Sequence, residues 1–77
     1  MYNTAVVAPR LQTLDDYRAE RSHIYPSGES LRWFIRQNRD ELAEAGALSL
    51  PTGRLLIEPD AFDRTVQSIG SRRARRS

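Results

Sequence analysis

Arginines are the residues of this chain whose type and spacing could do chemistry. Arg32, Arg36 and Arg39 recur three or four positions apart within a segment of helical periodicity. On a helix they fall on one flank, roughly 80 to 140° from the direction of Leu31. A guanidinium presents a planar set of donors that fits phosphate oxygens and guanine edges. This arginine stripe (Arg32, Arg36 and Arg39) therefore indicates a helix that lies along nucleic acid.

A second interpretation of the arginine stripe stays open. Arg36 has Asp40 four positions away and Arg32 has Glu29 three positions away, so both can form ion pairs on a solvated helix face. Trp33 points almost directly outward from the same helix, and an exposed tryptophan usually has a partner. It can pack under another segment, stack on a sugar-phosphate backbone, or lie in a protein interface.

Small hydroxyl residues and one more arginine accompany the stripe. Ser27 and Ser30 begin the helix, where backbone N–H groups and hydroxyls can hold a phosphate. The same residues can instead cap the helix. Thr52 and Arg54 lie at an expected hairpin turn, from which an arginine can reach phosphate or a narrow minor groove.

Charge is distributed unevenly along the chain. All 12 basic residues are arginine, and the formal net charge is +2. Residues 1–70 contain eight arginines and ten acidic residues, a net charge of −2, whereas residues 71–77 contain four arginines and no acid. Such a basic segment is often disordered and often contacts nucleic acid. We therefore expect a flexible tail whose DNA-binding residues are Arg72, Arg73, Arg75 and Arg76.

Length and composition exclude several classes of protein. The chain has 77 residues, enough for one small domain, and it has no cysteine and one histidine, His23. A zinc site or a Ser-His-Asp triad is therefore not expected, nor is an enzyme, a metal or a cofactor. No apolar run approaches the roughly 20 residues of a membrane span, and no signal peptide is recognisable. We expect a cytoplasmic protein that does not contact membranes.

The segments that must position these residues are expected to be helices around one hairpin. Residues 1–10 resemble an extended arm, and a short helix over about 13–21 begins at Thr13. In the next turn, Ile24 or Tyr25 is expected in the core. The main helix is predicted over about 28–45, with Ala45 among its inward residues and Gly46 as its stop.

The second half of the domain is predicted to be a hairpin followed by a helix. Apolar runs at 47–50 and 54–57 flank Pro51, Thr52 and Gly53. Pro59 suits the first position of a closing helix, which is expected to end at Gly70. Residues 11–70 thus form the predicted domain, a small α+β winged helix-turn-helix, with 71–77 as a flexible tail. In such a domain the second helix enters the major groove.

Three stretches carry a resemblance to a known family: TLDDYRAE (13–20), SGESLRWFIRQN (27–38) and GRLLIEPDAFDRTV (53–66). Together they resemble the excisionase-like winged-helix family, which is related to MerR-type DNA-binding domains. The resemblance implies that Ser30, Arg32, Trp33 and Arg36 face the DNA groove and that Arg54 belongs to the wing. Two departures are the longer linker at 21–28 and a second helix that runs past the usual length.

The resemblance implies a sequence-specific double-stranded DNA-binding protein, an excisionase (recombination directionality factor) of a phage or other mobile element in a bacterial host. Such a protein binds tandem sites, bends DNA and directs a tyrosine integrase toward excision. A single small module buries only about 600 to 1,000 Å² of interface, which favours cooperative, head-to-tail binding. A small transcriptional regulator of a mobile element is one alternative. A protein-interaction module or inhibitor without DNA binding is the alternative of another class.

Overall fold

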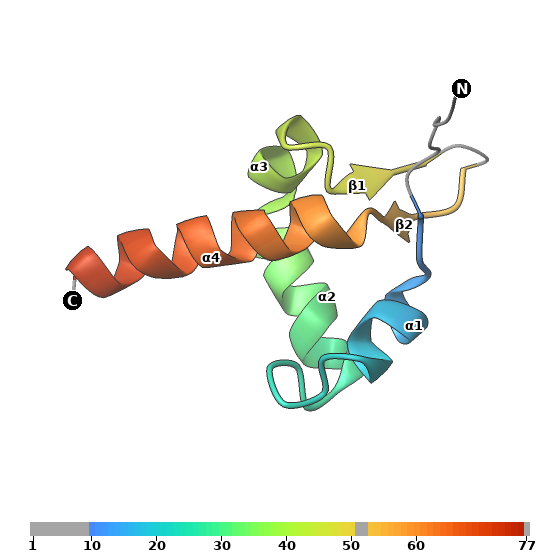
Figure 1. Ribbon diagram of the computed structural model, residues 1–77, viewed down its shortest axis with the longest axis horizontal. Coiled ribbons are helices and arrows are strands. Elements are labelled where there is room, and N and C mark those ends of the chain that lie inside the picture. The colour runs from blue at the N-terminus through green and yellow to red at the C-terminus, as the bar shows by residue number, and fades with distance from the viewer. Residues whose placement is uncertain (1–9, 51–52, 77) are drawn as a thin grey trace, which may run out of the picture.

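The helices pack beside one small antiparallel hairpin, which lies at one side of the molecule (Figure 1). The computed structural model describes residues 10–50 and 53–76, so the arm at residues 1–9 and Thr52 of the predicted turn lie outside the described residues. The elements are α1 (Leu14–Ala19), α2 (Gly28–Gln37), α3 (Arg39–Glu44), β1 (Leu48–Ser49), β2 (Leu56–Ile57) and α4 (Pro59–Arg76). The expected α+β class, with helices before and after a hairpin, is confirmed. None of the helices in this part of the chain is long and apolar enough to cross a membrane.

The first helix begins where the sequence predicts. The Thr13 side chain accepts a hydrogen bond from the Asp16 N–H at 3.1 Å, and two aspartates occupy the first turn. Negative charge there suits the positive end of the helix dipole. The helix buries Tyr17 and ends at Ala19, whose side chain is exposed.

The predicted long helix over 28–45 is wrong, because the chain breaks at Asn38. This residue has φ −129°, and its side-chain amide donates to the Phe34 carbonyl at 2.9 Å. An asparagine side chain that bonds to nearby backbone competes with the helical ladder. The chain turns there and resumes as α3, which buries Leu42 but leaves Ala45 exposed. The prediction that Ala45 lies in the core is therefore also wrong.

The hairpin is confirmed, with shorter strands than predicted. Leu48 pairs with Ile57 and Ser49 pairs with Leu56. Gly53 has φ +80°, a conformation that glycine adopts without steric cost and that bends the chain back toward β2. On the other edge of β2, Gln12 exchanges two backbone hydrogen bonds of 2.8 Å with Ile57. The segment before α1 is thereby held against the hairpin.

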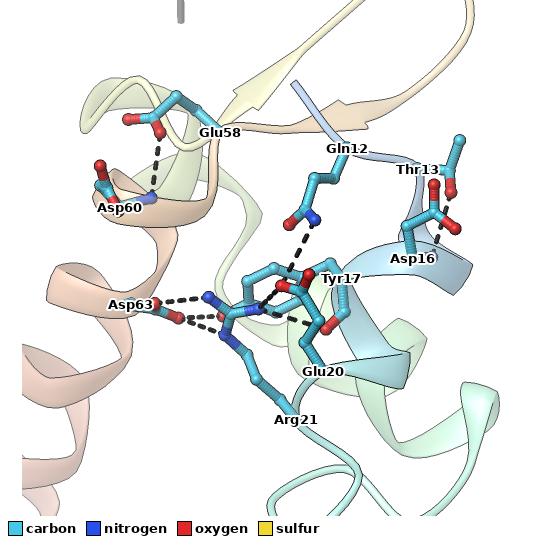
Figure 2. A network of polar contacts seen from close by, with 9 residues as sticks. All are labelled: Gln12, Thr13, Asp16, Tyr17, Glu20, Arg21, Glu58, Asp60 and Asp63. Carbon is cyan, nitrogen blue, oxygen red and sulfur yellow. Dashed lines mark hydrogen bonds and ion pairs between the residues drawn. The ribbon is translucent and has the colours of Figure 1, made fainter. Parts of the chain in front are cut away.

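The last helix is longer than predicted. Glu58 caps its start, because its carboxylate accepts from the Asp60 N–H at 3.0 Å and from the Ala61 N–H at 3.1 Å (Figure 2). The helix continues through Gly70 to Arg76. The prediction that it ends at Gly70 and leaves a flexible tail is therefore wrong. A helical glycine costs only about 1 kcal/mol, and the residues beyond it are mostly arginines, which are good helix formers and suit a helix C-terminus.

Aromatic rings form the centre of the core. The Tyr17 and Phe62 rings lie 4.8 Å apart, and Phe34 and Tyr25 each lie about 6 Å from a neighbouring ring. Tyr25 is 5% exposed and Ile24 is 51% exposed, so Tyr25 is the linker residue that packs inward. Aliphatic side chains complete the core, namely Leu31, Ile35, Leu42, Ile57 and Ile69.

A polar cluster joins α1 to α4 (Figure 2). Arg21 donates to both Asp63 carboxylate oxygens at 2.8 and 2.7 Å, and the Tyr17 hydroxyl donates to the same carboxylate at 2.5 Å. The Arg21 guanidinium also lies 3.9 Å from the centre of the Tyr17 ring. Bidentate, charge-assisted bonds of this kind fix geometry as well as energy. The Tyr17–Arg21–Asp63 cluster therefore sets how α4 lies against α1.

Candidate nucleic-acid interface

The three arginines of the stripe lie around one hollow. Arg32, Arg36 and Arg39 line a cavity of about 210 Å³ together with Leu14, Ile35 and Leu55. Its walls come from α1, α2, the start of α3 and the chain entering β2. We call this hollow the basic groove. The break at Asn38 does not separate Arg39 from the other two arginines, so the predicted clustering of the stripe is confirmed.

The basic groove keeps its positive charge. None of its three arginines lies within 4.0 Å of a carboxylate of residues 10–50 and 53–76. The Arg36–Asp40 and Arg32–Glu29 ion pairs that the sequence permits do not form. The Arg32 guanidinium instead lies back over the first turn of α2, where its Nη1 atom would be 3.3 Å from a Cβ on Gly28. All three side chains are solvent-exposed, so they remain available to an anionic partner.

The serines at the start of α2 cap the helix. The Ser27 hydroxyl oxygen accepts from the Ser30 N–H at 3.1 Å, and the Ser30 hydroxyl oxygen accepts from the Ser27 N–H at 3.3 Å. The Ser30 hydroxyl also donates to the Ser27 carbonyl at 2.7 Å. This reciprocal capping box satisfies the N–H groups of Ser27 and Ser30, two donors that a phosphate could otherwise use. The capping role is confirmed, and a phosphate contact by these serines stays a prediction.

Trp33 and Arg54 are both open to solvent. Trp33 lies on α2 and is 49% exposed, so about half of the residue is open to solvent. Arg54 is exposed beside Leu55, which lines the basic groove.

The C-terminal arginines do not share this surface. Arg72 donates to both carboxylate oxygens of Glu41 at 2.7 and 2.8 Å, which lowers the pKa of Glu41 below its usual range. Arg73, Arg75 and Arg76 are exposed at the end of α4. That end lies away from the hairpin, at the opposite end of the molecule (Figure 1). The single DNA-binding set predicted from the sequence is thus divided between two places.

The apolar floor of the basic groove is the part that sequence reasoning missed. Leu14 of α1 and Leu55, which precedes β2, both line the groove and are half-buried. A second hollow of about 200 Å³ adjoins the groove, because Arg39 and Leu55 line both. Leu48 and Leu50 line this second hollow, and Leu50 is 53% exposed. The signal in the sequence was the number of leucines in the apolar runs at 47–50 and 54–57, which is more than the two short strands can bury.

Within the described residues, no three His, Asp or Glu side chains converge as metal ligands. In comparisons with known proteins, no family model, no curated protein and no solved structure matches this chain. The function is therefore inferred from the site itself.

Proposed function

We propose that this protein binds double-stranded DNA through the basic groove. The observation that carries the proposal is the set of three exposed arginines, Arg32, Arg36 and Arg39, which face one hollow without a carboxylate partner among the described residues. Guanidinium groups on one flank of a helix suit phosphate contacts along a groove, and they can read guanine edges bidentately.

The arrangement of elements supports a winged helix-turn-helix as the finer form of the fold. α2 has ten residues and ends at Gln37, well short of the helix over about 28–45 that the sequence predicts. Gln12, β2 and β1 lie side by side, which fixes the hairpin next to α1 and α2. In this proposal α2 enters the major groove, Arg36 and Trp33 reach toward the bases or the backbone, and Arg54 of the hairpin contacts a neighbouring phosphate.

The biological role that we propose follows from the resemblance to excisionases. The protein would bind tandem sites head to tail in the bacterial cytoplasm, bend DNA and direct a tyrosine integrase of a phage or mobile element toward excision. A transcriptional regulator of the same element would use the same groove. Both roles require duplex binding, so duplex binding is the property to test first.

The test is the salt dependence of DNA binding. Binding is measured by fluorescence anisotropy on a duplex of roughly 30 base pairs, or about three helical turns. With about five phosphate contacts, the slope of log affinity against log salt should be near −4 to −5. Replacing Arg32 and Arg36 with alanine should flatten this slope by about two units, and Arg36→Ala alone by about one.

Arg64→Ala is the matched control, because Arg64 is an exposed arginine of α4 that does not line the basic groove. It should leave the slope within about half a unit of the wild-type value, since it removes no phosphate contact. If the protein ignores duplex DNA at low salt, or if Arg64→Ala flattens the slope as much as Arg36→Ala, the proposal is wrong. A protein-interaction module would then be the function to pursue.

A further inference from the structure

The C-terminal end of α4 projects beyond the rest of the molecule (Figure 1). From Pro59, which follows β2 directly, to Arg76 the helix axis rises about 25 Å at 1.5 Å per residue. The Debye length at physiological ionic strength is about 8 Å. Charges at the end of α4 and charges beside the hairpin therefore act on different neighbours.

The last two turns of α4 carry positive charge of their own. Arginines occupy four of the positions from 72 to 76, and the last acidic residue of the chain is Asp63. Arg72 is held by Glu41 of α3, which fixes the direction of this part of the helix. Arg75 and Arg76 lie beyond that ion pair and are exposed. The result is a basic projection, which we call the α4 projection (residues 70–76).

The chemistry of the α4 projection fits a polyanion better than a protein surface. Protein interfaces need an apolar or aromatic anchor in a desolvated centre, and their centres are depleted of charge. Residues 70–76 offer one alanine, one glycine and one serine besides the arginines, and the nearest large apolar residue, Ile69, is 2% exposed. Arginines without an apolar anchor are typical of contacts to a phosphate backbone.

We propose that the α4 projection is a second, separate surface for nucleic-acid phosphates, so that one chain holds two segments of duplex DNA at once. The basic groove binds one segment and the α4 projection binds the other. Holding two segments rests on the proposed function of the basic groove, whereas phosphate binding by the α4 projection does not. A protein of this kind would bring distant sites on one DNA molecule together.

The experiment is a two-duplex capture. A biotinylated duplex on beads is loaded with protein and washed, and a second, fluorescently labelled duplex is added. The wild-type chain should retain the second duplex. The double variant Arg75→Ala, Arg76→Ala should lose that retention to the level seen without protein, while it still loads onto the beads. Alanine keeps the helix, and the Arg72–Glu41 ion pair remains.

Controls separate this proposal from the proposed function and from other partners. Arg64→Ala, which also lies on α4, should retain the second duplex as the wild type does. Another outcome is that the double variant Arg32→Ala, Arg36→Ala leaves loading onto the beads unchanged while the double variant Arg75→Ala, Arg76→Ala weakens it. That result would show that the basic groove does not bind DNA and that the α4 projection binds phosphates. Retention that survives in the Arg75, Arg76 variant would overturn the proposal, since self-association would then account for it. Binding of a polyglutamate peptide at the α4 projection, without second-duplex retention, would overturn it in favour of an acidic protein partner.

Discussion

What faces each arginine decides what that arginine can do. Arg21 is bonded to Asp63 and lies over the Tyr17 ring, and Arg72 is bonded to Glu41, so both stabilise the fold. Arg36 and Arg39 face a hollow, with no carboxylate of the described residues within 4.0 Å of them. The arginines thus fall into two groups. Arg21 and Arg72 have structural contacts, whereas Arg36 and Arg39 can bind a partner without first breaking an ion pair.

At the residue scale, Asp63→Asn tests the Tyr17–Arg21–Asp63 cluster. Partial burial favours a raised pKa for Asp63, but the hydrogen bonds from Arg21 and Tyr17 outweigh it and hold the pKa below its usual range. Neutralising this carboxyl should lower the free energy of unfolding near neutral pH by about 1 kcal/mol, a value kept small because solvent screens the pair. Urea unfolding measures the change.

The effect of Asp63→Asn on the free energy of unfolding should depend on pH. A carboxyl whose pKa is depressed by folding contributes stability above its unfolded pKa of about 4, and loses it as the pH falls through the folded value. The difference between wild type and Asp63→Asn should therefore shrink as the pH is lowered below about 4. A difference that stays constant from neutral pH into this acid range would show that the charge of Asp63 does not stabilise the fold.

A second residue-scale prediction concerns the capping box. Ser27→Ala removes the acceptor of the Ser30 N–H and should destabilise the protein by about 1 kcal/mol in thermal or urea unfolding. Because the hydroxyls serve the helix, the affinity for DNA should not change. A loss of affinity with unchanged stability would instead assign Ser27 to a phosphate, and the salt slope would stay the same because the hydroxyl is uncharged.

At the scale of elements, local signals predicted beginnings better than ends. Thr13, Ser27 and Pro59 mark the starts of α1, α2 and α4, because caps and proline act on the residues next to them. The break at Asn38 and the continuation through Gly70 were missed. The first depends on a side chain that bonds to the Phe34 carbonyl, and the second is supported by an ion pair between residues far apart in sequence.

Gly70→Ala tests the continuation of α4, and Gly46→Ala, in the turn after α3, provides the contrast. Gly70 is helical with open space around its Cα, so Gly70→Ala should raise the free energy of unfolding by about 0.5 to 1 kcal/mol. Gly46 has φ +77°, so the same substitution there should destabilise by about 1 kcal/mol or more. If Gly70→Ala is neutral or destabilising in urea unfolding, the helix does not continue through this position in solution.

At the scale of the whole molecule, positive charge is divided between two ends. The basic groove lies between α1, α2 and the hairpin, and the arginines of α4 lie at the far end of the molecule (Figure 1). The arginine stripe could be predicted because it depends on the periodicity of one segment. Leu14 and Leu55 could not be predicted as its floor, because they reach the groove from other segments. The separation of the tail arginines from the basic groove could not be predicted either. It depends on α4 continuing through Gly70, where the sequence predicted that the helix would end.

The most direct test of DNA binding by the basic groove is a map of backbone amide shifts by NMR on adding a short duplex. The account predicts the largest changes on the exposed face of α2, at Arg39 and near Leu55. Changes at the end of α4 should appear only after more duplex is added. If the first changes are confined to residues 70–76, or if no residue of α2 shifts, the basic groove is not the DNA-binding surface.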